Sequence, residues 1–498
     1  MIFNSWKFIL LFLPITFFVY FWLNRNHMIV VGKAWLVLTS LFFYAYWNID
    51  DLALILVSIL LNFSIGTGLA QSYDDIDSHK RGRRYINRQM VLTIGIFANL
   101  FFLCYYKYYG FIFSNINSIF NIDYKITPVH MPLAISFFTF TQIVYLFDSY
   151  NGETAEYDFL NYSLFVTFFP HLIAGPIVQH KQIMPQFSSK WNLFERYSNI
   201  LKGMFIFSIG LFKKVIIADT FATWATAGFD GGQSLSFFAA WSTSLSYTFQ
   251  IYYDFSGYCD MAVGASLLFN IWLPMNFNSP LKARNIQEFW KRWHITLGNF
   301  LRDHLYIPLG GNRHGELRTC MTLLGVFVLA GLWHGATWMY VVWGAMHGTG
   351  LVIHRIWRRL NVSMPYLLAW FFTFVFFDVS MVFFRSKTLS DAIRVLKGMT
   401  DIESISAQSM LTVPTSDLAW AGRLVDVLSY FIPVSLFGSL PNYLAIFVAF
   451  ILISGKNSMQ LTLEGVGKEK MIYSSVLMAF SMSWMLATTS TVFLYFNF

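Results

Sequence analysis

The sequence predicts an all-α polytopic membrane protein, and both its composition and its apolar runs lead to this fold class. Of 498 residues, 56% are hydrophobic and only 12% are charged, whereas soluble domains carry roughly 25% charged residues. Many apolar runs approach the length of about 20 residues that a helix needs to cross a bilayer. The net charge of +8 arises mostly from Lys and Arg between these runs, so it indicates membrane topology rather than nucleic-acid binding.

We expect one integral membrane domain with three parts: N-terminal helices in 1–160, a motif-bearing core in 161–360, and C-terminal helices in 361–498. The first apolar run lacks the basic start and the small-residue cleavage site of a signal peptide, so it is interpreted as an uncleaved helix. The expected helices cover 8–23, 29–47, 52–70, 90–113, 133–150, 201–218, 237–255, 321–333, 338–356, 366–384, 424–437, 443–453 and 473–495.

Pro, Gly and polar residues interrupt the chain between 160 and 308. Such segments survive at membrane depth only when they are buried in protein or line a watery cavity, so this region is expected to contain re-entrant pieces. The interruptions include 169–171, 174–176, 273–278 and a polar break at 252–258.

Three polar segments outside the core predict topology. The basic segments 80–88 and 355–359 lie beside apolar runs and are expected to face the cytoplasm. The segment 386–417 is expected to begin with an amphipathic helix on the surface. Its apolar residues at helical spacing are Leu389, Ile393, Leu396 and Met399.

His294 follows a predicted helix start. Asn285 can cap this helix, with Glu288 three residues later. The helix is expected to place Phe289, Trp293, Leu297 and Phe300/Leu301 on one apolar face. Lys291, Arg292 and Arg302 could then reach lipid head groups or an anionic ligand, and the helix should end in a tight loop at 306–312. An ordinary histidine on an interfacial helix and a site histidine both fit this pattern.

His334 is the stronger candidate for a functional residue. An ionisable group at membrane depth marks a functional site by default, and histidine transfers protons near neutral pH. Gly331, Gly335 and Ala336 are small, so backbone and ligand can come close to the imidazole. A hydrogen-bonded core histidine is the alternative, and His347 is interpreted as structural support.

Several other classes of site are not indicated. Metal-ligand spacings, a serine-hydrolase elbow and nucleotide-binding glycine loops do not occur. Cys104, Cys259 and Cys320 lie too far apart for a disulfide framework. Asp254 and Ser256 lie in the polar break. The first interpretation is that they belong to a structural hydrogen-bond network, and the second is that they line the site.

These motifs resemble the signature of the membrane-bound O-acyltransferase superfamily, and within it the bacterial branch that O-acetylates alginate or peptidoglycan. The resemblance is carried by 289–313, 331–348, 170–177 and 253–258. It implies a ring of helices around a thin core, with an outer funnel and a cytoplasmic tunnel. It also implies that His334 is catalytic and that His294 is the second motif residue. The 493–498 segment resembles a hexamer in which the tyrosine, here Tyr495, carries the acyl group.

Acyl transfer to a hydroxyl needs a base and oxyanion donors. His334 is the direct candidate for the base. Trp333, Trp293 and His294 are candidate donors, and the remaining residues expected to line the site are Asp254, Ser256, Arg302 and Asn312.

The resemblance implies an inner-membrane O-acetyltransferase that takes acetyl groups from a cytoplasmic donor. The expected donor is acetyl-CoA, and neither a metal nor a resident cofactor is expected. Its expected partners are an exported polysaccharide, a periplasmic acetyltransferase and membrane lipid. An acyl transporter or channel whose partner performs the transfer, and a structural scaffold, are the alternatives. The sequence leaves open which polysaccharide is acetylated.

Overall fold

The computed structural model describes residues 1–77, 87–154, 158–405, 440–488 and 493–494, and within these ranges the chain is helical without a strand. Five of the described helical segments are long and apolar enough to cross a membrane: Lys7–Arg25, Asp50–Ser72, Arg88–Phe120, Glu316–His334 and Tyr366–Arg385. The all-α, multi-pass membrane class predicted from composition is therefore confirmed.

The N-terminal helices pack through buried amide groups. Asn62 and Asn99 donate hydrogen bonds to each other between α3 and α4, at 3.2 and 2.6 Å. Gln142 on α6 donates to Ser58 at 3.0 Å. Such bonds join helices where lipid provides no alternative partner. The elements are η1 Lys7–Phe12, α1 Leu13–Arg25, α2 Ile29–Ala45, α3 Asp50–Asp77, α4 Arg88–Leu103, η2 Cys104–Tyr108, α5 Tyr109–Phe120 and α6 Ile135–Tyr150.

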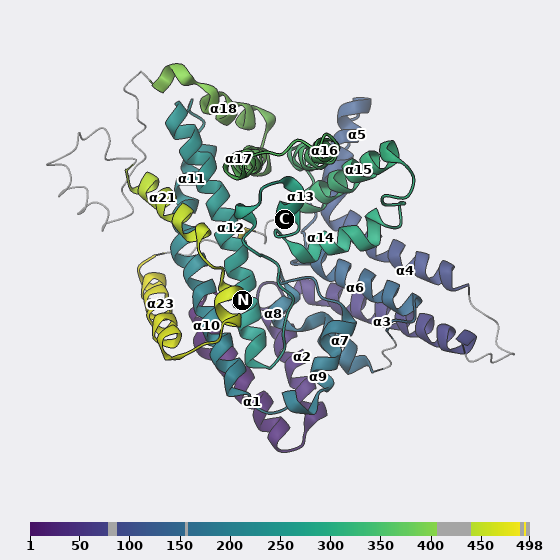
Figure 1. Cartoon of the computed structure of the whole chain (residues 1–498). Helices are drawn as coiled ribbons and strands as arrows, with labels where there is room; N and C mark the ends of the chain where they lie inside the picture. The colour runs from purple at the N-terminus through teal and green to yellow at the C-terminus, as the bar shows by residue number, and fades with distance from the viewer. Residues whose placement is uncertain (78–86, 155–157, 406–439, 489–492, 495–498) are drawn as a thin grey trace.

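The middle of the chain combines short buried helices with one long helix, α12, which runs through the molecule beside α10 and α11 (Figure 1). The short α8 contains Pro170 and His171, both buried, as predicted for an interrupted segment enclosed by protein. The elements are α7 Phe159–Thr167, α8 Phe169–Leu172, α9 His180–Ser188, η3 Lys190–Asn192, α10 Tyr197–Phe212, η4 Lys213–Ala218, α11 Asp219–Asp230 and α12 Phe237–Leu268.

The predicted polar break at 252–258 is wrong, because α12, which is 32 residues long, continues through it without interruption. Gly257 marks a close approach of two helices instead of a helix end. A Cβ on Gly257 would lie 2.8 Å from the carbonyl oxygen of Gly210, and one on Gly210 would lie 2.6 Å from that of Gly257. Small residues at such crossings let two backbones touch.

The second half of the chain folds largely as predicted. Helix α15 lies beside α16, and α16 in turn lies beside α17 (Figure 1). The elements are η5 Pro280–Lys282, α13 Ile286–Trp290, α14 Ile295–Leu301, η6 Arg302–Tyr306, α15 Glu316–His334, α16 Trp338–Arg359, α17 Tyr366–Arg385, α18 Leu389–Thr400, η7 Ile402–Ile405, α21 Leu440–Ser454, α22 Ser458–Leu463 and α23 Lys468–Ala487.

Two predicted helices differ from the structure in length or in buried face, and two predicted segments lie outside the described residues. Helix α23 ends at Ala487, so the helix expected to reach 495 is shorter. Helix α18 forms as predicted, but it buries Ala392, Val395 and Met399, whereas Leu389 and Ile393 are exposed. The expected helix 424–437 and most of the basic segment 80–88 lie outside the described residues.

The glycine contact between α10 and α12 predicts opposite effects for two matched substitutions. Gly257→Ala should destabilise the protein by about 1–3 kcal/mol, because the added methyl group overpacks the contact. Gly68→Ala on α3 should be neutral or slightly stabilising, since its Cβ meets no atom within 4 Å and alanine favours a helix. Thermal unfolding in detergent measures both, and equal unfolding temperatures would contradict the role of Gly257.

Candidate active site

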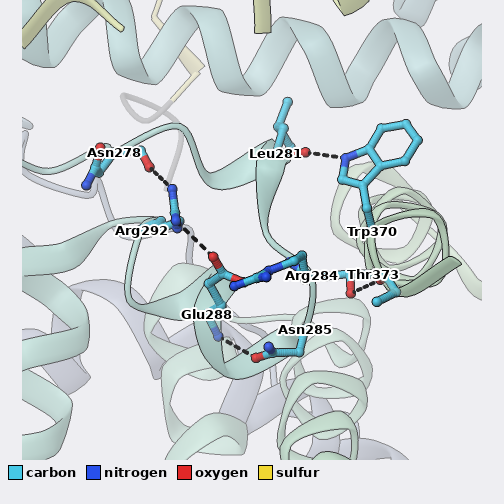
Figure 2. A network of polar contacts seen from close by, with 9 residues as sticks. Asn278, Leu281, Arg284, Asn285, Glu288, Arg292, Trp370 and Thr373 are labelled. Carbon is cyan, nitrogen blue, oxygen red and sulfur yellow. Dashed lines mark hydrogen bonds and ion pairs between the residues drawn. The ribbon is translucent and has the colours of Figure 1, made fainter. Parts of the chain in front are cut away.

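A network of polar contacts fixes the short helix α13 (Figure 2). The Asn285 side chain accepts a hydrogen bond from the Glu288 backbone at 2.8 Å, so the predicted cap is confirmed. The Glu288 carboxylate accepts bonds from the Arg284 backbone at 3.0 Å and from the Arg292 guanidinium at 2.8 Å. Arg292 also donates to the carbonyl oxygen of Asn278 at 3.3 Å. These bonds hold α13 against the extended segment before it.

The continuous helix predicted after Asn285 is wrong, because it breaks at His294. Helix α13 ends at Trp290 and α14 begins at Ile295. His294 has φ 44° and ψ 52°, a left-handed conformation that is uncommon outside glycine. The backbone N–H of Ile295 donates to the Asn276 carbonyl oxygen at 3.0 Å, which holds the turn. His294 is fully buried, so the interfacial-helix alternative is also wrong.

The contacts of Asn276 assign the tautomer of His294. Asn276 Oδ1 accepts bonds from the Thr296 backbone N–H at 3.1 Å and from its hydroxyl at 3.0 Å, so this atom is the amide oxygen. His294 Nδ1 lies 3.2 Å from the same oxygen. Because an amide oxygen can only accept, Nδ1 carries the proton of a neutral ring. Nε2 of His294 therefore has the lone pair.

His334 ends α15 inside a cage of aromatic rings from three helices. Its ring centroid lies 4.9 Å from that of Trp333, 5.1 Å from Trp343 on α16 and 5.3 Å from Phe384 on α17. The Trp333 ring also lies 6.2 Å from the ring of His294. One indole thus contacts both histidines that the sequence analysis singled out.

Two buried indole N–H groups beside His334 have no hydrogen-bond partner among the described residues. They belong to Trp333 and Trp343, which are 6% and 2% exposed. An unpaired buried donor is costly, so it points to a ligand or water in the functioning protein. Trp333 was predicted from the sequence, whereas Trp343 was not, although it lies within the motif at 331–348.

The glycines around His334 have a different role from the predicted one. A Cβ on Gly331 would lie 2.2 Å from the Tyr340 carbonyl oxygen, and one on Gly335 would lie 2.1 Å from the Tyr340 ring. The space beside both glycines is therefore filled by α16. They allow α15 and α16 to pack closely, and they do not leave room for a ligand.

His347 and Trp293 lie among bonded or packed aromatic side chains. His347 Nδ1 accepts from the Trp290 indole at 3.2 Å, and Nε2 lies 3.0 Å from the Ser380 hydroxyl. Both ring nitrogens are thus bonded, in line with the support role expected for His347. Trp293 packs its ring against Phe277 and Phe377, with ring centroids 5.1 and 5.2 Å apart, and its role as an oxyanion donor stays a prediction.

Lys107 and Tyr108 bond the end of α15 directly before His334. The Lys107 ammonium group donates to the carbonyl oxygen of Trp333 and, at 3.1 Å, to the Ser136 hydroxyl. The Tyr108 hydroxyl donates to the Leu332 carbonyl oxygen at 2.8 Å. The last carbonyl groups of a helix have no partner within it, so these two side chains complete the end of α15. Both come from the π-helical turn η2, a geometry frequent at functional sites.

The remaining predicted site residues are dispersed. Asp254 and Ser256 are buried on α12, and the Ser256 hydroxyl has no hydrogen-bond partner among the described residues. Arg302 is exposed and paired with Asp303 at 2.7 Å, so it does not join the buried histidines. Asn312 is exposed as well. Tyr495 lies outside the described residues.

Asn312 lines a basic cavity of about 420 Å³ at the Arg359 end of α16. Arg355 and Arg359 share the carboxylate of Glu316, whereas Arg358 forms no ion pair within the described ranges. The cavity therefore carries excess positive charge. The full lining is Gln287, Tyr306, Asn312, Leu323, Leu351, His354, Arg355, Arg358 and Arg359. A cluster of His, Cys, Asp and Glu that could hold a metal does not occur in the described part of the chain.

The fold and the site define a multi-pass, all-helical membrane protein with two buried histidines joined through a tryptophan. The profile of the membrane-bound O-acyltransferase family matches residues 41–389. The chain belongs to this family and is therefore an O-acyltransferase, as the resemblance in the sequence implied.

Curated relatives agree with this assignment. The chain is 42% identical to the peptidoglycan O-acetyltransferase of Helicobacter pylori over 531 aligned positions, which cover 100% of the chain and 98% of that protein. It is 38% identical to the probable alginate O-acetylase AlgI of Pseudomonas putida, over 80% of each chain. It is 29% identical to the teichoic acid D-alanyltransferase of Streptococcus thermophilus, over 46% of this chain and 57% of that one.

The contact between Lys107 and α15 predicts that Lys107→Met lowers acyl transfer strongly. The substitution leaves the Trp333 carbonyl oxygen without its ammonium donor, a loss of about 1–3 kcal/mol for a buried group, and it frees the end of the helix that carries His334. Lys107→Arg retains a donor and should recover part of the activity. The control is Lys125→Met at an exposed position. Full activity of purified, folded Lys107→Met would refute this role.

Proposed function

We propose that this chain is an O-acetyltransferase of the bacterial cytoplasmic membrane that transfers acetyl groups from cytoplasmic acetyl-CoA to an exported polysaccharide. The observation that carries the proposal is the site around His334. There a buried imidazole, two indole N–H groups without partners and a second histidine meet in one aromatic cage. Acyl transfer needs this combination of a base and donors for the oxyanion.

The proposed reaction has two transfers. His334 takes the proton of the Tyr495 hydroxyl as its oxygen attacks the thioester carbonyl carbon, and the indole N–H groups of Trp333 and Trp343 donate to the oxyanion. The carbon–sulfur bond then breaks, and the thiolate leaves as coenzyme A after taking a proton. In the second transfer, a hydroxyl oxygen of the acceptor attacks the acetyl-tyrosine ester and restores the Tyr495 hydroxyl. Phenol has a pKa of about 10 in its free form, so the first transfer needs the base.

The basic cavity at the Arg359 end of α16 supports a phosphorylated donor. Arginine guanidinium groups bind phosphate with paired hydrogen bonds, and Arg358 forms no ion pair within the described ranges. From Arg358 to Trp343 the helix rises by roughly 22 Å at 1.5 Å per residue. A long pantetheine arm suits this separation between phosphate groups and reacting carbonyl. The positive charge also favours a cytoplasmic position for this end.

Peptidoglycan is the acceptor that we favour, with an alginate-like polysaccharide as the alternative. The relative of 42% identity that spans the whole chain is named a peptidoglycan O-acetyltransferase, and the relatives named for alginate align over 80% of the chain. Either acceptor lies outside the cytoplasmic membrane. A periplasmic acetyltransferase would therefore receive the acetyl group and deliver it to the polymer.

The first test replaces His334 with glutamine, which retains a polar side chain but cannot act as a base near neutral pH. Removal of a positioned proton acceptor should lower transfer from acetyl-CoA by about 10²–10⁴-fold. Purified protein in liposomes and radiolabelled acetyl-CoA provide the measurement, as the rate at which label becomes covalently bound to the protein in the first transfer. His27→Asn, at an exposed histidine between α1 and α2, is the control. Transfer by His334→Gln at the control rate would exclude the proposed base.

The second test concerns the donor cavity. Arg358→Gln should raise the KM for acetyl-CoA about tenfold or more, because a hydrogen bond to a charged group is lost, while kcat changes little. Arg318→Gln, at an exposed position of α15 outside the cavity lining, serves as the matched control. Unchanged KM in Arg358→Gln would place donor binding elsewhere.

A further inference from the structure

The segment Phe493–Leu494 lies in the protein core against α12. Phe493 is 2% exposed, and its ring stacks on that of Tyr258 with centroids 4.3 Å apart and an angle of 17°. The backbone N–H of Leu494 donates to Asp254 Oδ2 at 2.9 Å. A membrane helix was predicted up to 495, but α23 ends at Ala487, and the backbone bond of Leu494 to a buried carboxylate is a specific attachment.

The carboxylate that holds Leu494 is itself fixed by a buried cation. Asp254 Oδ1 lies 2.8 Å from the Lys214 ammonium nitrogen, which also lies 2.7 Å from Asp219. The side chains of Lys214 and Asp254 are each 2% exposed. Burial makes an unpaired charge very costly, so this ion pair keeps the Asp254 carboxylate in one place. Its second oxygen faces Leu494.

Lys214 lies in the π-helical turn η4, Lys213–Ala218. On an α-helix two consecutive residues point about 100° apart. In η4, however, both Lys213 and Lys214 bond aspartates of α12, at Asp260 and Asp254. The turn thus forms two ion pairs with α12, and within the described residues it is the Asp254 pair that bonds Leu494.

The attachment lies next to one of the site histidines. Phe255 follows Asp254 on α12, and its ring centroid is 4.8 Å from that of His294 and 6.0 Å from that of Phe493. One phenylalanine ring thus separates the segment from His294. The residue after Leu494 in the sequence is Tyr495, the proposed acyl carrier.

We propose that Asp254, held by Lys214, is a positioning residue that seats the Phe493–Leu494 segment beside His294 and so aligns the acyl carrier for transfer. Its effect on activity rests on the proposed function, whereas the seating itself does not. Asp254 touches no reacting atom. It acts through the backbone of Leu494, and its loss lowers kcat without changing the KM for acetyl-CoA, since the proposed donor cavity lies elsewhere.

Asp254→Asn tests the seating, with Asp260→Asn as the matched control. Asparagine has one oxygen and one NH₂ group. If the oxygen faces Lys214, the NH₂ group opposes the Leu494 N–H and the segment is released. Asp260→Asn breaks an ion pair of similar length, 2.7 Å, on the same helix without touching the segment.

The readout is maleimide labelling of Leu494→Cys in a chain whose three native cysteines are replaced by alanine. Labelling should accelerate about tenfold or more in Asp254→Asn, as expected for loss of a hydrogen bond to a charged group, and should not change in Asp260→Asn. Equal labelling rates in the two folded variants would overturn the proposal.

A second variant leaves the core intact. Leu494→Pro removes the N–H donor and keeps the ion pair, so it should lower kcat as Asp254→Asn does, at unchanged KM and unfolding temperature. Leu494→Ala is its control and should be active. Normal kcat in Leu494→Pro would overturn the positioning role.

Tyr495→Phe separates this proposal from the proposed function. If Tyr495→Phe is fully active while labelling accelerates in Asp254→Asn, the acyl-carrier step is wrong and the seating stands. If Tyr495→Phe is inactive while Asp254→Asn labels slowly, the acyl carrier stands and the seating is wrong.

Discussion

The carbonyl groups at the end of α15 impose the constraint on which the site depends. This helix ends inside the protein at His334, which is buried. Each carbonyl group that has no partner within the helix must then accept a hydrogen bond from another part of the protein. Lys107 and Tyr108 supply donors to Trp333 and Leu332, so the helix can stop at His334 and present its ring to Trp343 and Phe384.

Small side chains and irregular helical turns both shape how the helices pack, at different places in the protein. At Gly210 and Gly257 two helices touch because neither has a side chain there. At η2 and η4 an additional residue in the helical turn directs Lys107 and Lys214 inward instead. Close contacts bring the helices together, and the π-helical turns supply the charges and donors that the enclosed site needs. At His294 a left-handed residue, bonded through Asn276, turns an imidazole into the core.

Much of the fold was predictable because apolar runs report directly on burial in lipid or protein. Local signals performed less well where tertiary contacts decided the backbone. The Ser256–Gly257 pair resembled a helix break, but packing against Gly210 keeps α12 intact. Conversely, the pattern after Asn285 fitted one continuous helix, and the bonds of Asn276, 18 positions before His294 in sequence, interrupt it. Neither outcome can be read from the residues next to the break.

The two histidines and Trp333 were found from the sequence because ionisable groups in apolar surroundings are conspicuous. Trp343 was missed because a tryptophan in an aromatic-rich helix looks like ordinary core. Lys107 could have been predicted from the sequence. A single lysine within the apolar run 90–113 is energetically costly, so it indicates a functional or bonded residue. Arg302 was predicted as a site residue because of its charge. The structure pairs it with Asp303 at an exposed position, so its charge does not require a site.

Leu494 and Asp254 are 240 positions apart in sequence, and this separation has a consequence for how the protein is made. During synthesis α12 enters the membrane long before residue 494 is translated. For that time the core must persist without the contacts of the Phe493–Leu494 segment. The ion pair between Asp254 and Lys214 compensates both charges during that interval. Biogenesis then has two stages: insertion of a stable but open core, and its closure when the distant segment folds back onto α12.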